Sequence, residues 1–129
     1  MQDTPVGRRG QMVAVDTIEC TIPDAADGLM EAGVDLEAYG DAAIQMPAAW
    51  TAADLTFQGA VTLAGTYADV YDSDGNELTV SAAQARAIGL TAAEASVLRA
   101  FRFVKMRSGT SAVPVQQAAD RTVTLILKR

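Results

Sequence analysis

Short runs in which apolar and polar residues alternate recur along this chain of 129 residues, and turn-forming residues separate the runs. A period of two is typical of a β-strand with one buried face. The runs span residues 12–22, 43–46, 55–61, 67–71, 77–80, 101–106 and 121–127. They do not alternate with long helical patterns, so the sequence predicts an all-β fold, an antiparallel β-sandwich or jelly roll.

Two local motifs add detail to this fold. The run Asp72-Ser73-Asp74-Gly75-Asn76 between two predicted strands is typical of a tight hairpin turn. Thr91 and Glu94 have the spacing of a capping box, and apolar residues follow, which predicts at most one short helix before residue 100. Residues 24–40 are acidic and rich in glycine, and we expect a loop there with a helical turn at most.

The first ten residues differ from the rest. Residues 1–10 contain Pro5, Gly7, Gly10 and the pair Arg8-Arg9. Such a segment is too poor in apolar residues to hold itself against its own domain, so we expect an extended N-terminal arm that becomes ordered against a partner. We predict a single β-sandwich domain for residues 11–129, with Arg8 and Arg9 contacting an acidic or carbonyl-rich surface of the partner.

Charge and hydropathy exclude several function classes. The formal net charge is −6, and an acidic protein lacks the main source of affinity for nucleic acid. No apolar stretch approaches the roughly 20 residues of a membrane span, and the N-terminus lacks the apolar segment of a signal peptide. We therefore expect no nucleic-acid or membrane partner, and a location in the cytoplasm or in a particle assembled there.

The strand pattern also predicts the core. Seven residues of the alternating runs are expected to supply much of it: Phe57, Phe101, Phe103, Val104, Val123, Leu125 and Leu127. Phe103 and Val104 are neighbours, so only one of the two can point inward. Cys20 has Ile18 and Ile22 at strand spacing on either side, which indicates an inward-facing free thiol.

The residues needed for common enzyme chemistry are scarce. The chain has no histidine and one cysteine, so we expect no zinc site and no cofactor. A pair of carboxylates, as in a glycosidase, stays open because there are 16 acidic residues. These residues lie mainly in loops and turns, where solvated charge is the ordinary explanation, and we predict that the protein is not an enzyme.

Two loops bear a partial likeness to ligand-binding motifs. Oxygen-bearing side chains cluster around the hairpin turn: Asp69, Asp72, Asp74, Asn76 and Glu77. The final glutamate of an EF-hand would fall at Ser81, so a tight turn explains the cluster better than calcium. The run Arg107-Ser108-Gly109-Thr110 lacks the glycine pattern and the lysine of a phosphate-binding loop, and a turn between strands explains it.

The aromatic residues leave two readings open. Trp50, Tyr67 and Tyr71 would suit a platform on which sugars stack. A lone tryptophan is more often an anchor in a core or at an interface, so Trp50 joins Arg8 and Arg9 as a candidate partner-binding residue.

Several stretches of residues 42–129 together resemble a known family. They are Pro47-Ala48-Ala49-Trp50-Thr51-Ala52-Ala53-Asp54-Leu55-Thr56-Phe57-Gln58, Tyr71-Asp72-Ser73-Asp74-Gly75-Asn76-Glu77, Arg107-Ser108-Gly109-Thr110-Ser111 and Pro114-Val115-Gln116-Gln117-Ala118-Ala119-Asp120-Arg121. The chain resembles small structural proteins of tailed phages and prophages, and the order of these stretches is also similar to the galactose-binding type of jelly roll.

The resemblance implies a place in the virion. The leading interpretation is a capsid decoration or cement protein that binds the major capsid protein or another virion protein, as a homo-oligomer with a trimer expected. The alternative is a carbohydrate-binding module of a head or tail fibre. No catalytic motif comes with the resemblance.

Overall fold

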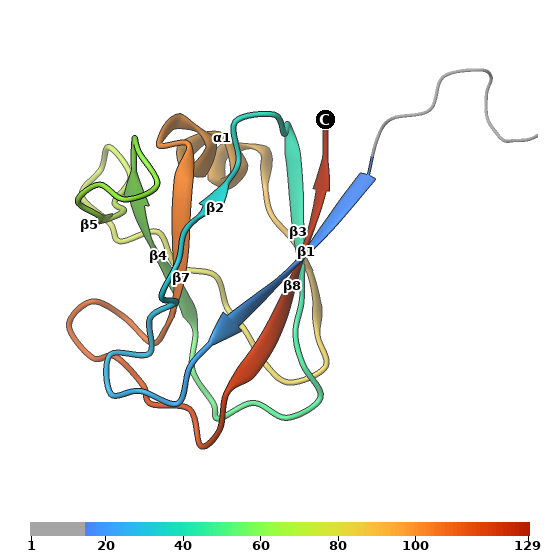
Figure 1. Cartoon of the computed structure of the whole chain (residues 1–129), viewed down its shortest axis with the longest axis vertical. Helices are drawn as coiled ribbons and strands as arrows, with labels where there is room; N and C mark the ends of the chain where they lie inside the picture. The colour runs from blue at the N-terminus through green and yellow to red at the C-terminus, as the bar shows by residue number, and fades with distance from the viewer. Residues whose placement is uncertain (1–14) are drawn as a thin grey trace, which may run out of the picture.

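The computed structural model describes residues 15–129, which form two four-stranded antiparallel sheets that pack face to face (Figure 1). The first sheet has the strand order β1-β8-β3-β6, and the second has the order β2-β7-β4-β5. The elements are β1 (Val15–Ile22), β2 (Val34–Asp35), β3 (Asp41–Gln45), β4 (Leu55–Ala60), β5 (Ala68–Asp69), β6 (Ala87–Gly89), α1 (Ala92–Ala100), β7 (Phe103–Ser108) and β8 (Arg121–Lys128). The predicted all-β antiparallel sandwich is thus confirmed. The arm predicted for residues 1–10, with Arg8 and Arg9, lies outside the described residues.

Strands β1 and β8 form the longest pairing of the first sheet. Their register runs from Val15 opposite Lys128 to Ile22 opposite Arg121. Along β1, Cys20 and Ile22 are buried, whereas Glu19 is exposed, as the alternation predicts. The inward-facing thiol expected for Cys20 is therefore confirmed.

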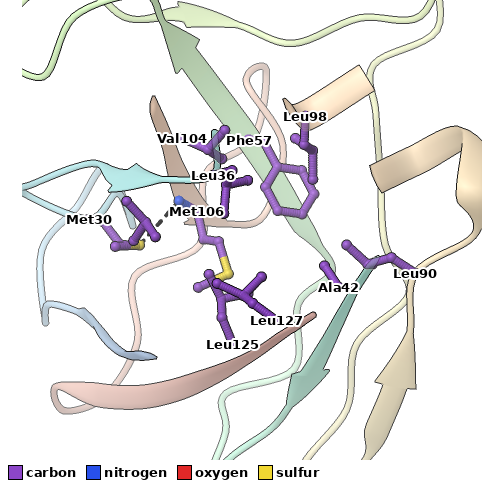
Figure 2. A pocket seen from close by; sticks show the side chains of 11 residues that line it. Met30, Leu36, Ala42, Phe57, Leu90, Leu98, Val104, Met106, Leu125 and Leu127 are labelled. Atoms are coloured by element: carbon purple, nitrogen blue, oxygen red, sulfur yellow. Dashed lines mark hydrogen bonds between the residues drawn. The ribbon is translucent and has the colours of Figure 1, made fainter. Parts of the chain in front are cut away.

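Apolar side chains of both sheets meet in the core (Figure 2). Phe57 of β4 and Met106 of β7 come from the second sheet, while Leu125 and Leu127 of β8 come from the first. Leu98 of α1 covers one end of this layer. The cavity left between them measures about 20 Å³, which is the space of one water molecule, and its walls are apolar, so it is a packing void.

Two of the predicted core phenylalanines are only half-buried. Val104 and Met106 point into the core, so the neighbouring Phe103 belongs to the opposite face of β7. Phe101 is the C-cap of α1 and not a strand residue, and its ring packs against Gly59. Phe101 packs against the core from the end of the helix, so its prediction as a core residue is confirmed in part. The prediction of Phe103 as a core residue is wrong, because Val104 is the member of this pair that points inward.

The capping box is confirmed at the start of α1. The Thr91 hydroxyl accepts a hydrogen bond from the Glu94 amide at 3.1 Å, and the Glu94 carboxylate accepts one from the Thr91 amide at 2.9 Å. The helix buries Ala95 and Leu98 against the sheets. No helix within residues 15–129 is long and apolar enough to cross a membrane.

Three short strands depart from the sequence prediction. The predicted loop at residues 24–40 contains β2, and β6 was not predicted at all. Around the hairpin turn, the strands predicted at residues 67–71 and 77–80 are shorter than expected. They consist of the two-residue strand β5 and an isolated bridge between Tyr71 and Glu77. The turn itself is confirmed: Gly75 has φ +84°, and its amide donates to the Asp72 carbonyl at 3.1 Å.

The burial of Phe57 gives a direct test of the core. Because its side chain is only 1% exposed, we expect Phe57→Ala to lower the free energy of unfolding by about 3–5 kcal/mol. Phe103→Ala makes the same change at a half-buried site and should cost about 1 kcal/mol. Chemical denaturation measures both values, and equal losses would contradict the assignment of Phe103 to the outer face.

Candidate interaction surface

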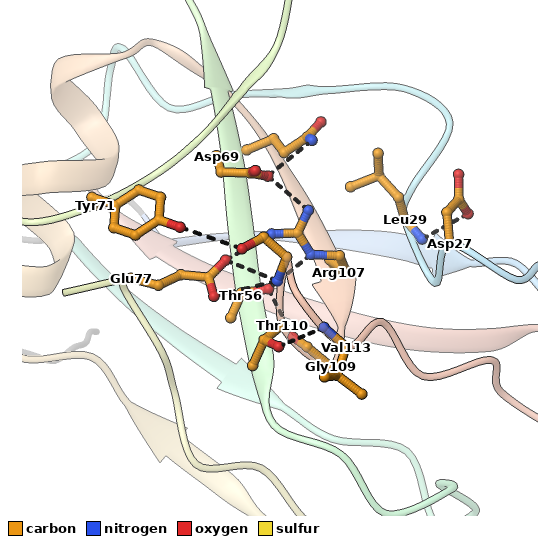
Figure 3. A network of polar contacts seen from close by, with 12 residues as sticks. Asp27, Leu29, Thr56, Asp69, Tyr71, Glu77, Arg107, Gly109, Thr110 and Val113 are labelled. Atoms are coloured by element: carbon orange, nitrogen blue, oxygen red, sulfur yellow. Dashed lines mark hydrogen bonds and ion pairs between the residues drawn. The ribbon is translucent and has the colours of Figure 1, made fainter. Parts of the chain in front are cut away.

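A buried arginine lies on the outer face of the second sheet (Figure 3). Since Val104 and Met106 of β7 point inward, Arg107 points outward, and it is paired with Thr56 of the neighbouring strand β4. Arg107 is nevertheless buried, with only 5% of its surface exposed, because the segments that follow β5 and β7 cover it. An arginine in such a place requires full compensation of its charge.

Three acceptors surround the guanidinium group. Nη1 donates to Asp69 Oδ1 at 2.8 Å, Nη2 to Glu77 Oε2 at 2.9 Å and Nε to Thr56 Oγ1 at 3.0 Å. The Thr56 hydroxyl in turn donates to the Gly109 carbonyl at 2.7 Å. Each nitrogen of Arg107 therefore has a partner, and two carboxylates share the positive charge.

The same contacts hold two loops on the sheet. Glu77 closes the hairpin and also accepts the Ser111 amide, at 3.1 Å on Oε2 and 3.3 Å on Oε1. Asp69 belongs to β5, at the edge of the second sheet. Arg107 thus connects the edge strand, the hairpin and the turn after β7 through one side chain.

The hydrogen bond from Arg107 holds the pKa of the Asp69 carboxyl below its usual range. Desolvation opposes this shift, and a hydrogen bond from Gln58 supports it. Asp69 is consequently ionised at neutral pH and occupied by its partners.

A second buried polar cluster centres on Gln117, whose side chain is fully buried. Its amide nitrogen donates to the Thr51 carbonyl at 2.9 Å and to Ser108 Oγ at 2.7 Å. Its carbonyl oxygen accepts from the Thr51 amide at 2.7 Å and from Arg121 Nε at 3.2 Å. The long connection between β7 and β8 is therefore fastened near both of its ends.

The turn in this connection has its own constraints. Gly109 has φ +90°, and a Cβ there would lie 2.6 Å from the Val113 carbonyl oxygen, so only glycine fits. The Thr110 amide donates to the Val113 carbonyl at 3.1 Å, and the Val113 amide donates to Thr110 Oγ1 at 3.0 Å. The turn is thus held from inside as well as by Glu77.

Apolar side chains project from these fastened loops. Val113 is 67% exposed and Tyr71 is 48% exposed. The Tyr71 hydroxyl lies 3.4 Å from Ser111 Oγ, so the hairpin and the turn meet at the surface. We call Tyr71, Ser111 and Val113 the hairpin–turn surface.

Trp50 does not lie on an exposed surface. It is 8% exposed, belongs to the hydrophobic core, and its indole N–H donates to the Ala53 carbonyl at 3.0 Å. Tyr67 bonds to the Leu63 carbonyl and packs under Lys105, whose ammonium lies 4.3 Å from the ring centroid. The interpretation of Trp50, Tyr67 and Tyr71 as a sugar platform is therefore wrong, because the Trp50 ring is buried, whereas the favoured interpretation of Trp50 as an anchor is confirmed for the core. Trp50 offers no exposed face to a partner.

The carboxylates of the hairpin serve the turn and the arginine. Asp72 Oδ1 accepts the amides of Asp74 and Asn76 at 2.9 and 3.0 Å. Glu77 and Asp69 bind Arg107. Within residues 15–129 no group of three or more acidic or cysteine side chains is arranged to hold a metal ion.

Burial raises the pKa of the Cys20 thiol to about 11, so the thiolate nucleophile does not form at neutral pH.

Sequence reasoning missed Arg107 and Gln117. Arg107 and Ser108 belong to the end of β7 and not to a turn. The signal was nonetheless present in the stretches that carry the family resemblance. Those stretches contain most of the residues that the two clusters bring together: Thr51, Thr56, Glu77, Arg107, Ser108, Gly109, Ser111, Gln117 and Arg121.

Comparison with known proteins gives one informative likeness. No protein-family model matches the sequence, and no curated protein matches it either. The solved structure of the SPBc2 prophage-derived protein YomS is similar, with a TM-score of 0.52 over 92% of this chain and 98% of that chain. The two sequences are 10% identical over this match, so what they share is the fold. A prophage-derived protein thus has the same sandwich along nearly its whole length.

The Arg107 cluster predicts a large asymmetry between two arginines. Arg107→Met leaves Asp69 and Glu77 without their buried partner and should lower the free energy of unfolding by about 3–5 kcal/mol. Arg102 also pairs with two carboxylates, Asp35 and Glu37, but its side chain is 49% exposed. Arg102→Met should therefore cost no more than about 1 kcal/mol. Similar losses in urea denaturation would show that Arg107 is not the compensated buried charge described here.

The lowered pKa of Asp69 predicts a dependence on pH. An aspartate with a depressed folded-state pKa stabilises the protein fully at pH values above its unfolded-state pKa of about 3.9. This contribution is lost as the pH falls through the folded-state pKa. The difference in unfolding free energy between the wild type and Asp69→Asn should thus shrink between about pH 5 and pH 2. Denaturation across this range measures it, with Asp74→Asn at an exposed turn position as the matched control. A constant difference would contradict the prediction.

Proposed function

We propose that this chain is a non-enzymatic structural protein of a tailed-phage particle, and that it decorates the capsid by bridging or stabilising capsid subunits. The shared fold of a prophage-derived protein supports a phage origin. The use of hairpin carboxylates as partners of Arg107 and the protonated state of Cys20 support a role without catalysis.

The observation that carries the proposal is the hairpin–turn surface. Two exposed apolar side chains, Tyr71 and Val113, sit on loops that a buried arginine already holds in place. Ordering loops on binding costs free energy, so loops that are ordered beforehand bind with a smaller penalty. A capsid lattice offers the same site many times, and moderate affinity per copy suffices when neighbouring copies also touch.

The proposed partners follow from this role. The hairpin–turn surface contacts the major capsid protein or another virion protein, and the location is the virion. Copies associate with one another as a homo-oligomer, for which a trimer is our working assignment, and Arg8 and Arg9 provide polar contacts between partners.

The composition of purified particles tests the role. Quantitative mass spectrometry of particles from a phage or prophage that encodes this chain should find it in a fixed ratio to the major capsid protein. Its absence from intact particles would overturn the proposal. Enrichment in isolated tails, with none in heads, would move it from the capsid to the tail.

A single charged substitution tests the hairpin–turn surface. Val113→Asp places a carboxylate in the proposed contact and should reduce occupancy on particles by about tenfold or more, since an unpaired charge is costly in an interface. The free protein should melt at an unchanged temperature, because Val113 is exposed. Val61→Asp is the matched control, a valine 75% exposed in the loop after β4. Equal occupancy of both variants would show that the contact lies elsewhere.

A further inference from the structure

An open groove is lined by residues of β1 and by the segment that leads into β2. β1 is an edge strand of one sheet, and β2 is an edge strand of the other. Its volume is about 350 Å³, far larger than the void in the core. Cys20, Met30 and Val34 give it a buried apolar floor. Two exposed carboxylates, Glu19 and Glu31, stand at its rim, and the ten residues that line it include no lysine or arginine.

The groove is bordered by a long strand edge. β1 has eight residues and pairs with β8 on one side, and within residues 15–129 no strand pairs with its other side. The other three edge strands, β2, β5 and β6, have only two or three residues each. Unpaired N–H and C=O groups along an edge of this length are a template for an added strand.

The groove therefore specifies its occupant. It fits an extended segment that carries positive charge for the rim and apolar side chains for the floor. The sequence of this chain contains such a segment ahead of β1: Arg8-Arg9 is followed by the apolar Met12-Val13-Ala14, and Asp3 is its one acidic residue.

The sequence just ahead of β1 does not favour a fold-back of this segment onto the same copy. Residues 11–14 read Gln-Met-Val-Ala and contain none of the residues that favour a tight reversal just before β1. A reversal at Gly10 would leave Arg8 and Arg9 beside residues 11–13, short of Glu19 in the second half of β1. A segment that arrives from another molecule has no such restriction.

We propose that the groove between β1 and β2 binds residues 1–14 of a second copy of this chain, with Arg8 and Arg9 paired to Glu19 and Glu31. The inference rests on the self-association that belongs to the proposed function, and it assigns the surface and the segment that produce it. Exchange of arms between copies gives a closed ring or a chain of molecules, according to the angle of each contact.

Charge reversal of the full-length chain tests the assignment. One variant carries Glu19→Lys and Glu31→Lys, and a second carries Arg8→Glu and Arg9→Glu. Light scattering and sedimentation up to about 0.1 mM should find the wild type associated, and each variant should raise the dissociation constant by about tenfold or more. Asp74→Lys is the matched control at an exposed position of the hairpin, and it should associate as the wild type does. Since Glu19 and Glu31 are exposed, we expect circular dichroism to show the groove variant folded, and the same measurement checks the arm variant.

Mixing the two reversed variants identifies the donor of the segment. Each variant then offers the charge that the other lacks, so an equimolar mixture should regain association if arm and groove belong to different copies. A monomeric wild type, or a groove variant that associates as tightly as the wild type, would overturn the proposal. A monomeric wild type whose melting temperature falls in each variant and recovers when all four changes are combined would assign the groove to the arm of the same copy.

These measurements need no particles. Absence of the chain from virions would overturn the decoration role and leave the groove assignment standing. Failure of the mixing experiment would overturn the groove assignment and leave the decoration role standing.

Discussion

The arrangement of the loops on the outer face of the second sheet depends on the buried charge of Arg107. A guanidinium group removed from water loses several kcal/mol of solvation, and it stays buried only where acceptors replace the water. Here the acceptors come from β4, β5 and the hairpin, so the side chain is satisfied only when all three are in register. An apolar residue could give similar stability. It could not specify which carboxylates must lie where, and that is what positions the hairpin and the following turn.

The buried arginine also explains why β4 is covered on both faces. One face of a sandwich strand normally meets the core and the other meets water, which gives alternation. In β4 both Phe57, on the core face, and Thr56, on the outer face, are buried. The loops that Arg107 and Gln117 hold take the place of solvent on this side. The sheet thus supports a surface of loops that buried polar side chains hold in place.

The longer elements could be predicted because their information is local. The alternation of β1 and β8 and the Thr91–Glu94 capping box each depend on residues within a few positions of one another, and the structure confirms them. β2 and β6 have two or three residues and exist because β7 and β3 offer them partners, so no local pattern could reveal them. The same holds for the site: Arg107 lies 38 residues from Asp69 and 30 from Glu77. Sequence showed the acidic hairpin and the arginine separately, and only the fold shows that they belong together.

The edge strands of the two sheets differ in how they are protected from pairing with another chain. Natural sheets protect their edges by keeping edge strands short or by placing charges on them. β2, β5 and β6 follow the first route, whereas β1 is long and carries Glu19 on its exposed face. Two β1 strands that paired directly would bring acidic residues together, which disfavours that contact. The same carboxylate favours a basic segment, so one side chain both rejects the wrong strand and selects the right one.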